Sequence, residues 1–86
     1  MRGMQPQHFV YVLESLADPD RHYIGLAANV WTRLEAHNSG LSPHTTRYRP
    51  WRLLVAIGFA DVDRAVRFEK FLKTGTGEAF ARHHFR

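Results

Sequence analysis

Turn-forming and helix-capping residues divide this 86-residue chain into five or six short segments. In residues 9–14 (FVYVLE), apolar side chains occupy both faces of an extended chain, which predicts a strand covered on both sides. Asp18-Pro19-Asp20 predicts a turn. Residues 21–26 (RHYIGL) follow it and are interpreted as the second strand of a hairpin. The fold is therefore expected to begin with a β-hairpin.

A helix and a hydrophobic strand are predicted next. Asn29 is a good N-cap for a helix over residues 30–38, and Gly40 can end that helix with a positive φ. A loop over residues 41–50 follows. Residues 52–60 form the most hydrophobic stretch of the chain, which we interpret as a central or well-covered strand.

The last predicted helix follows this strand. Asp61 is its expected N-cap, and the helix continues to about Lys73, where Thr74-Gly75-Thr76-Gly77 stops it. Residues 78–86 are expected to add a helical turn or two. The predicted order of elements is β-β-α-β-α with a short tail.

Composition sets limits on the class of protein. A chain of 86 residues with 44% apolar residues provides one core, so residues 1–86 are predicted to form a single domain. The longest apolar run, residues 53–60, is too short for a membrane span, and residues 1–8 look like a frayed start and not a signal peptide. The absence of Cys excludes disulfide scaffolds, Cys-ligated zinc and thiol nucleophiles. We expect a soluble, cytoplasmic protein with no membrane partner.

Basic residues are concentrated in the second half of the chain. Residues 44–86 carry nine Lys and Arg against four carboxylates, whereas residues 1–43 carry three Arg against four carboxylates. Together with the interleaved aromatics, this balance favours a polyanion partner, because cations that neutralise phosphates also release counterions. A solvated surface that keeps the protein soluble is the alternative explanation.

Glu69 conflicts with the pattern of the helix that carries it. The apolar stripe of this predicted helix consists of Val62, Ala65, Val66 and Leu72. Glu69 falls in the middle of the stripe. Because burial of an unpaired carboxylate is costly, Glu69 must meet an Arg, a hydrogen-bond network or a cation. A structural ion pair with an Arg or a Lys is the simpler of these explanations.

Arg33 and His37 form a ridge on the first predicted helix. They are four residues apart and lie at the edge of the inner side, which is formed by Val30, Trp31 and Leu34. An Arg at this position can hold a phosphate with two hydrogen bonds, and a His beside it can orient a water or take a proton. The alternative is an exposed rim in which Arg33 pairs with a neighbouring carboxylate.

Tyr11 and Tyr23 lie on adjacent strands of the predicted hairpin, so their hydroxyls can converge on one face. Each can be an ordinary amphipathic core residue. In a cationic pocket, however, a Tyr can accept a proton, because Arg or a metal lowers its pKa from about 10. Two Tyr, one Arg, one His and one inward Glu form a set that suits phosphodiester chemistry.

These residues also carry a family resemblance. Phe9-Val10-Tyr11, then Tyr23-Ile24-Gly25, then Arg33 and finally a helix with Glu69 occur in the order and at the spacing of the GIY-YIG nuclease domain. The chain resembles this family over residues 8–74, in particular its small stand-alone bacterial members, which are similar to the N-terminal domain of the excision-repair incision subunit.

The resemblance implies a fold and a site. The fold is an α/β sandwich in which helices flank a three-stranded, mainly antiparallel sheet, with a core over residues 8–74 and a tail over residues 75–86. In the implied site Glu69 binds a single Mg²⁺ or Mn²⁺, Arg33 steadies the scissile phosphate and one motif Tyr activates the attacking water. The remaining roles are auxiliary: His37 positions water or transfers a proton, and Gly25 lets the backbone pass close to the substrate.

The loop over residues 44–52 alternates hydrogen-bond donors, cations and aromatics, which suits a groove for a nucleic-acid backbone. A solvated loop with Trp51 tucked into the core is the alternative. We expect nucleic-acid contacts from Thr45, Arg47, Arg49, Arg52, Lys70 and Lys73.

The leading hypothesis is a divalent-metal-dependent DNA endonuclease of GIY-YIG type that is structure-directed or weakly sequence-specific. It would act on branched or damaged DNA in repair or processing, as a homodimer or in a larger repair complex. The alternative hypothesis is an accessory nucleic-acid-binding module with the same fold and little or no activity. A purely structural domain would leave Glu69 unexplained.

Overall fold

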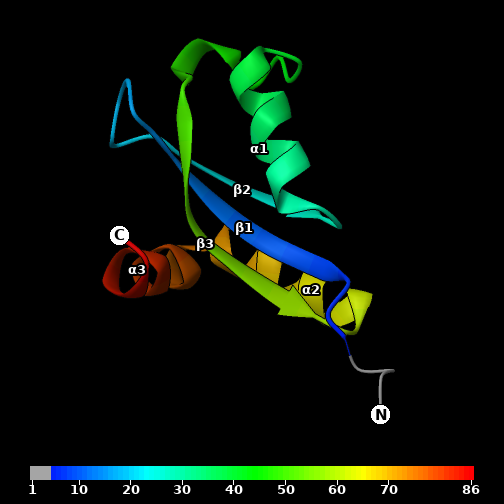
Figure 1. Cartoon of the computed structure of the whole chain (residues 1–86). Helices are drawn as coiled ribbons and strands as arrows, with labels where there is room; N and C mark the ends of the chain where they lie inside the picture. The colour runs from blue at the N-terminus through cyan, green and yellow to red at the C-terminus, as the bar shows by residue number, and fades with distance from the viewer. Residues whose placement is uncertain (1–4) are drawn as a thin grey trace.

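The computed structural model describes residues 5–86 and contains three strands and three helices (Figure 1). Of the segment expected to be a frayed start, residues 1–4 lie outside the described residues. The elements are β1 (His8–Ser15), β2 (His22–Ala27), α1 (Val30–Ser39), the 3-10 turn η1 (Thr46–Tyr48), β3 (Trp51–Phe59), α2 (Val62–Leu72) and α3 (Gly75–His84).

The three strands form one antiparallel sheet in the order β2-β1-β3. Tyr11 of β1 is paired with Gly25 on one side and with Ala56 on the other. The expectation that the most hydrophobic strand is central is wrong, because β1 occupies the centre and β3 forms an edge. Exposed Ala56 and Gly58 show that β3 is only partly covered, whereas Val10 to Leu13 of β1 are at most 1% exposed.

Helices cover both faces of this sheet. Figure 1 shows α1 on one side and α2 and α3 on the other. Side chains alternate along β1, so Val10 and Val12 contact one helical layer and Tyr11 and Leu13 the other. On the first side, Ala65, Leu72 and Ala81 of the helices complete the core. On the second side, Val30 of α1 and Trp51 of β3 complete it. The predicted strand with two covered faces and the α/β sandwich are confirmed.

The caps of α1 are those that the sequence predicts. The Asn29 side chain accepts a hydrogen bond from the Thr32 N–H at 3.1 Å, and Gly40 ends the helix with φ 84°. The inner side of α1 differs from the prediction, because Trp31 is 69% exposed while His37 is buried. The apolar side of this short helix is therefore narrower than its sequence indicates.

The end of the chain is more helical than predicted. Thr74, which was expected only to end α2, is also the N-cap of α3. Its hydroxyl accepts a hydrogen bond from the Gly77 N–H at 3.0 Å. Gly77 has a packing role in this helix, because a Cβ there would lie 1.7 Å from the Phe71 carbonyl oxygen. The predicted turn or two is thus a ten-residue helix that packs closely on the end of α2.

Within residues 5–86, no helix is both long enough and apolar enough to cross a membrane. The cytoplasmic location stays a prediction.

Candidate active site

Gly25 makes room for the Tyr11 side chain. A Cβ at position 25 would lie 2.4 Å from the Tyr11 hydroxyl oxygen and 2.5 Å from the ring carbon that bears it. The Tyr11 phenol therefore extends from the central strand across the backbone of β2, toward the edge of the sheet. A glycine is therefore needed at position 25, because the Tyr11 side chain fills the space that a Cβ would occupy.

His37 joins Tyr11 to the loop that follows α1. Its Nε2 lies 3.0 Å from the Tyr11 hydroxyl, and its Nδ1 lies 2.7 Å from the Thr45 hydroxyl. The Tyr23 ring packs on the imidazole with centroids 4.7 Å apart, and it lies 6.2 Å from the Tyr11 ring. The two tyrosines therefore converge on one face, as predicted, and His37 lies between them and the loop.

Burial keeps both partners of this hydrogen bond neutral near pH 7. Burial and the neighbouring Tyr23 raise the pKa of the Tyr11 phenol, while the positive charge of Arg33 acts against them. Burial, and to a lesser extent the Arg33 charge, lowers the pKa of His37. A neutral imidazole can accept a proton, and a neutral phenol can donate one.

Arg33 of α1 and Glu69 of α2 both influence the Tyr11 phenol. The charge of each acts on Tyr11: Arg33 lowers the pKa of the phenol and Glu69 raises it. Arg33 is exposed, and within residues 5–86 it takes part in no ion pair. The Arg33 guanidinium therefore has no carboxylate partner among residues 5–86, and a guanidinium of this kind can bind a phosphate.

The Glu69 carboxylate is the one predicted metal ligand. Its side chain is 18% exposed and pairs with Lys73 at 2.7 Å, so the expected compensation is present. The described part of the chain contains no group of three or more His, Cys, Asp or Glu that could hold a metal. This donor set fits a hard cation such as Mg²⁺, which keeps waters and takes substrate phosphates as further ligands.

The match to known proteins extends over almost the whole chain. The sequence profile of the GIY-YIG catalytic domain matches residues 7–81. The chain belongs to the GIY-YIG family. The predicted family, fold class and enzyme class, a GIY-YIG endonuclease domain, are confirmed, and GIY-YIG nucleases are generally dependent on a divalent metal.

Similar proteins include one from a eukaryote and two from bacteria. The "Structure-specific endonuclease subunit SLX1 homolog" of Giardia intestinalis is 37% identical over 65 residues, which are 71% of this chain and 18% of that protein. A UPF0213 protein of Streptococcus pneumoniae is 38% identical over 71 residues, 81% of this chain and 70% of that protein. A UPF0213 protein from a second pneumococcal strain is 37% identical over the same length and shares. No solved structure matches the chain.

The predicted nucleic-acid contacts of this GIY-YIG domain have different surroundings. Arg52 donates two hydrogen bonds to Glu14, at 2.9 and 2.7 Å, and Lys73 is bound to Glu69. Arg49 packs against Gly40 at the end of α1. Lys70 is exposed. Lys70 and Lys73 belong to α2 and its C-cap, whereas Arg49 precedes β3 and Arg52 lies in it.

The remaining two predicted contacts come from the loop before β3. Arg47 lies over the Tyr48 ring at 5.4 Å, and Arg21 from the β1–β2 turn lies over the same ring at 4.7 Å. Thr45 is different, because it is 1% exposed and its hydroxyl is held by His37 and Ser42. Burial leaves the Thr45 side chain no surface for a nucleic acid, so its expected contact is replaced by a place in the interior network.

Sequence reasoning missed the residues that anchor this loop. The Asn38 side chain accepts a hydrogen bond from the Trp51 N–H at 2.6 Å and donates one to the Trp51 carbonyl at 3.0 Å. The Trp51 indole donates to the Thr45 carbonyl at 2.9 Å, and Ser15 donates to the Tyr48 carbonyl. An Asn late in a helix gives no sequence signal for such a contact. Trp51 is buried, as the alternative reading of the loop expected.

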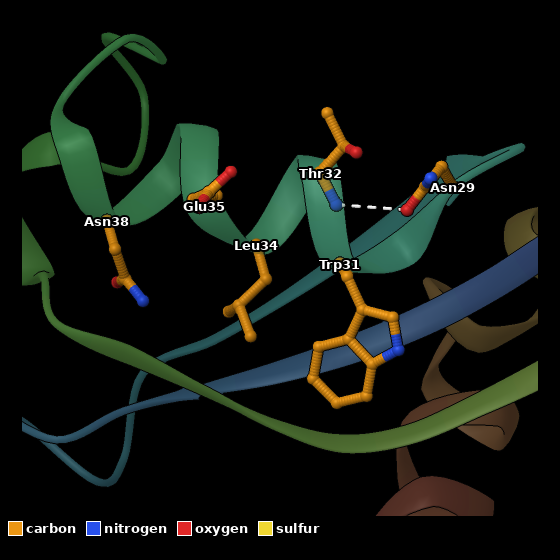
Figure 2. Close-up of a pocket in the computed structure, with 6 residues that line it drawn as sticks. All are labelled: Asn29, Trp31, Thr32, Leu34, Glu35 and Asn38. Atoms are coloured by element: carbon orange, nitrogen blue, oxygen red, sulfur yellow. Dashed lines mark hydrogen bonds between the residues drawn. The ribbon is translucent and has the colours of Figure 1, made fainter.

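One hollow of the described residues lies along α1. It has a volume of about 480 Å³, and Trp31 and Leu34 extend into view from the side of α1 that faces the strands (Figure 2). Its lining consists of Asn29, Trp31, Thr32, Leu34, Glu35 and Asn38. None of the predicted catalytic residues lines this hollow.

Proposed function

We propose that this chain is a divalent-metal-dependent DNA endonuclease that hydrolyses phosphodiester bonds in branched or damaged DNA during repair or processing. The observation that carries the proposal is that four side chains from three elements act on the Tyr11 phenol. His37 bonds to it, Tyr23 packs beside it, and Arg33 and Glu69 act on it by charge. A purely structural core has no need for this set.

Arg33 is proposed to hold the scissile phosphate. It is exposed and free of carboxylate partners within the described residues. A guanidinium can donate two parallel hydrogen bonds to phosphate oxygens, which fixes the orientation of the phosphorus for in-line attack. Tyr11 lies beneath this clamp and is bound to His37, so it supports Arg33 from the interior.

Tyr23 is proposed to contact the attacking water, because it keeps part of its surface exposed while Tyr11 is 0% exposed. Tyr23 accepts a proton from the water and releases its own hydroxyl proton to solvent. The water oxygen forms a bond to phosphorus, the bond from phosphorus to the leaving oxygen breaks, and that oxygen takes a proton from solvent. The net reaction is hydrolysis.

Glu69 is proposed to hold Mg²⁺ or Mn²⁺. When bound, such a cation would neutralise charge on the phosphate and on the leaving oxygen. Lys73 occupies the same carboxylate at 2.7 Å, so it must yield when the cation binds. A single carboxylate binds Mg²⁺ weakly, which makes the DNA phosphates necessary partners in the site.

Structured DNA is the proposed substrate because a domain of 86 residues offers little surface for reading a long sequence. The Giardia relative is named as a structure-specific endonuclease subunit, which supports this choice. The word subunit in that name also supports a larger complex as the working form, with a homodimer as the other arrangement.

One observation favours the accessory binding module as a second candidate. In the structure Glu69 is already neutralised by Lys73, so its partial burial does not by itself require a metal. A domain that only binds DNA would retain the ion pair, the exposed Arg33 and the basic loop.

A cleavage assay separates the two candidates. Purified protein is incubated with supercoiled, branched and single-stranded DNA in Mg²⁺, in Mn²⁺ or in EDTA, and binding is measured in parallel. The nuclease proposal expects metal-dependent cutting, strongest on branched DNA, which Arg33→Ala abolishes and which a second exposed arginine variant, Arg67→Ala, retains. Salt-sensitive binding without cutting in any metal contradicts it and supports the accessory module.

A further inference from the structure

Thr45 is a buried polar residue with no role in the reaction as described so far. It lies just before η1 and is 1% exposed. Its hydroxyl oxygen is 2.7 Å from His37 Nδ1 and 3.3 Å from the Ser42 carbonyl oxygen. A hydroxyl has one proton to donate. Either this proton goes to Nδ1, or it goes to the carbonyl and Nδ1 carries a hydrogen of its own.

The Tyr11 end of the imidazole decides between these arrangements. The Tyr11 hydroxyl is fully buried, and within residues 5–86 the only hydrogen-bond acceptor in reach of its proton is His37 Nε2, at 3.0 Å. If Nε2 carried the ring hydrogen, the Tyr11 O–H would be buried without an acceptor, which is unfavourable. If Nδ1 carries it, every donor is used: Nδ1–H bonds to Thr45, Thr45 to Ser42, and Tyr11 to Nε2.

We propose that Thr45 is a positioning residue, which holds His37 as the Nδ1–H tautomer and so makes the Tyr11 hydroxyl a donor to His37. The lone pairs of the Tyr11 oxygen then remain available to the neighbouring Arg33 guanidinium, a group that can only donate. The opposite tautomer would turn the Tyr11 proton toward this cation. Thr45 thereby keeps Arg33 beside Tyr11, in the place where the proposed function needs it to bind phosphate.

The tautomer is measured directly by ¹⁵N NMR of the histidine rings, in which protonated and unprotonated nitrogens resonate in separate ranges. We expect His37 in the native protein to be protonated at Nδ1 and not at Nε2. Thr45→Val, which removes the only acceptor for Nδ1–H within residues 5–86, is expected to populate the Nε2–H form, and Thr45→Ser is expected to restore the native spectrum. A native protein with His37 protonated at Nε2 overturns the proposal, whatever the variants do.

The proposed effect of Thr45 on Arg33, through His37 and Tyr11, rests on the proposed nuclease function and is tested separately. Single-turnover cleavage of branched DNA by Thr45→Val is expected to be on the order of tenfold slower than by the native chain, a loss typical of one hydrogen bond to a charged group. In an Arg33→Ala background the same substitution is expected to have no further effect, because residues that act through one another are not additive.

The outcomes of the two tests are distinguishable. Equal slowing by Thr45→Val in both backgrounds contradicts the proposed effect of Thr45 on Arg33. If the native chain cuts no DNA, the nuclease proposal fails, while the NMR spectrum still decides the role of Thr45. If Thr45→Val does not fold, the native spectrum and Thr45→Ser carry the decision.

Discussion

A missing side chain at position 25 determines where the Tyr11 phenol lies. Any larger residue would place its Cβ 2.4 Å from the Tyr11 hydroxyl. Gly25 therefore allows Tyr11 to reach His37, and His37 in turn reaches Thr45. These contacts keep the Tyr11 phenol in the interior and leave Tyr23 as the partly exposed member of the pair.

This division of roles makes a prediction for Tyr23. Tyr23→Phe removes only the hydroxyl that we assign to the attacking water, so cleavage is expected to slow by roughly 100-fold, the lower end of proton-transfer effects. DNA affinity measured in EDTA should change little. Tyr48→Phe is the matched control, because Tyr48 comes from the loop before β3 and its ring lies beneath Arg21 and Arg47. Equal rates for Tyr23→Phe and the control would remove Tyr23 from the mechanism.

Neutral His37 makes a prediction for stability against pH. Its pKa is lower in the folded chain than the ordinary 6.5, because burial disfavours the charged ring. Below about pH 6.5 the unfolded chain therefore binds a proton that the folded chain does not, so the free energy of unfolding falls as the pH falls through this range. Above that range this contribution is present in full.

Urea unfolding between about pH 8 and about pH 5.5 tests this dependence. His37→Gln is expected to be less stable at pH 8 but to lose less stability on acidification than the native chain, whereas His83→Gln, at an exposed position of α3, should behave as the native chain does. Glu14 does not affect the result in this pH range. The hydrogen bond from Arg52 lowers the pKa of Glu14, so its contribution to the free energy of unfolding is lost only below about pH 4.5. If the free energy of unfolding depends on pH in the same way for the native chain and for His37→Gln, the account is contradicted.

At the scale of elements, the contact between α2 and α3 depends on one glycine. A Cβ at Gly77 would lie 1.7 Å from the Phe71 carbonyl oxygen, which is backbone and cannot turn aside. Gly77→Ala is therefore expected to destabilise the chain by about 1–3 kcal/mol. Gly75→Ala is the control, because nothing lies within 4 Å of its Cβ and alanine favours a helix over glycine.

Urea unfolding measures both glycine variants. Loss of stability in Gly77→Ala with an unchanged or raised stability in Gly75→Ala is the expected pair of results. If the two variants unfold at the same urea concentration, α3 does not pack on α2 in the way described.

Elements whose signals are local could be predicted from the sequence. Asn29, Gly40 and Asp61 cap helices as expected, and alternation along β1 predicted its two covered faces. Strand order is not local, so the hydrophobicity of β3 predicts a central or well-covered strand, although β3 lies at an edge and is only partly covered. The early start of α3 was missed because Thr74 and Gly77 are both typical of a turn.

The candidate site shows the same limit. The sequence predicts a site with Tyr11, Tyr23, Arg33, His37 and Glu69, and the fold brings Tyr11, Tyr23 and His37 into contact. The Thr45 contact with His37 and the Asn38 contact with Trp51 depend on how a loop folds back on a helix. Residue type alone assigned Thr45 to a nucleic-acid surface, whereas the structure places it inside.

At the scale of the whole molecule, the chain has a formal net charge of +4, and binding to DNA should weaken as salt rises. The slope of log Kd against log salt concentration reports how many phosphates are neutralised. Arg33→Ala is expected to reduce this slope by about 0.7–0.9, which corresponds to one phosphate contact.

Arg64→Ala is the control for that measurement, because Arg64 lies on α2 and pairs with Asp61 at 3.6 Å. The titration is made with branched DNA in EDTA, so that cleavage does not interfere. Identical slopes for the native chain, Arg33→Ala and Arg64→Ala would show that Arg33 does not contact a phosphate.

The central claim, that this GIY-YIG domain cuts DNA with a metal held by Glu69, is tested most directly by one measurement. Single-turnover cleavage of branched DNA in Mg²⁺ or Mn²⁺ is compared for the native chain, Glu69→Gln and Glu78→Gln, a surface glutamate paired with Arg82 on α3. We predict cutting by the native chain and by Glu78→Gln, with none in EDTA, and a loss of at least about 100-fold in Glu69→Gln, since the metal would lose its one protein carboxylate. Cutting by Glu69→Gln at the native rate, with the same dependence on metal, would contradict the account.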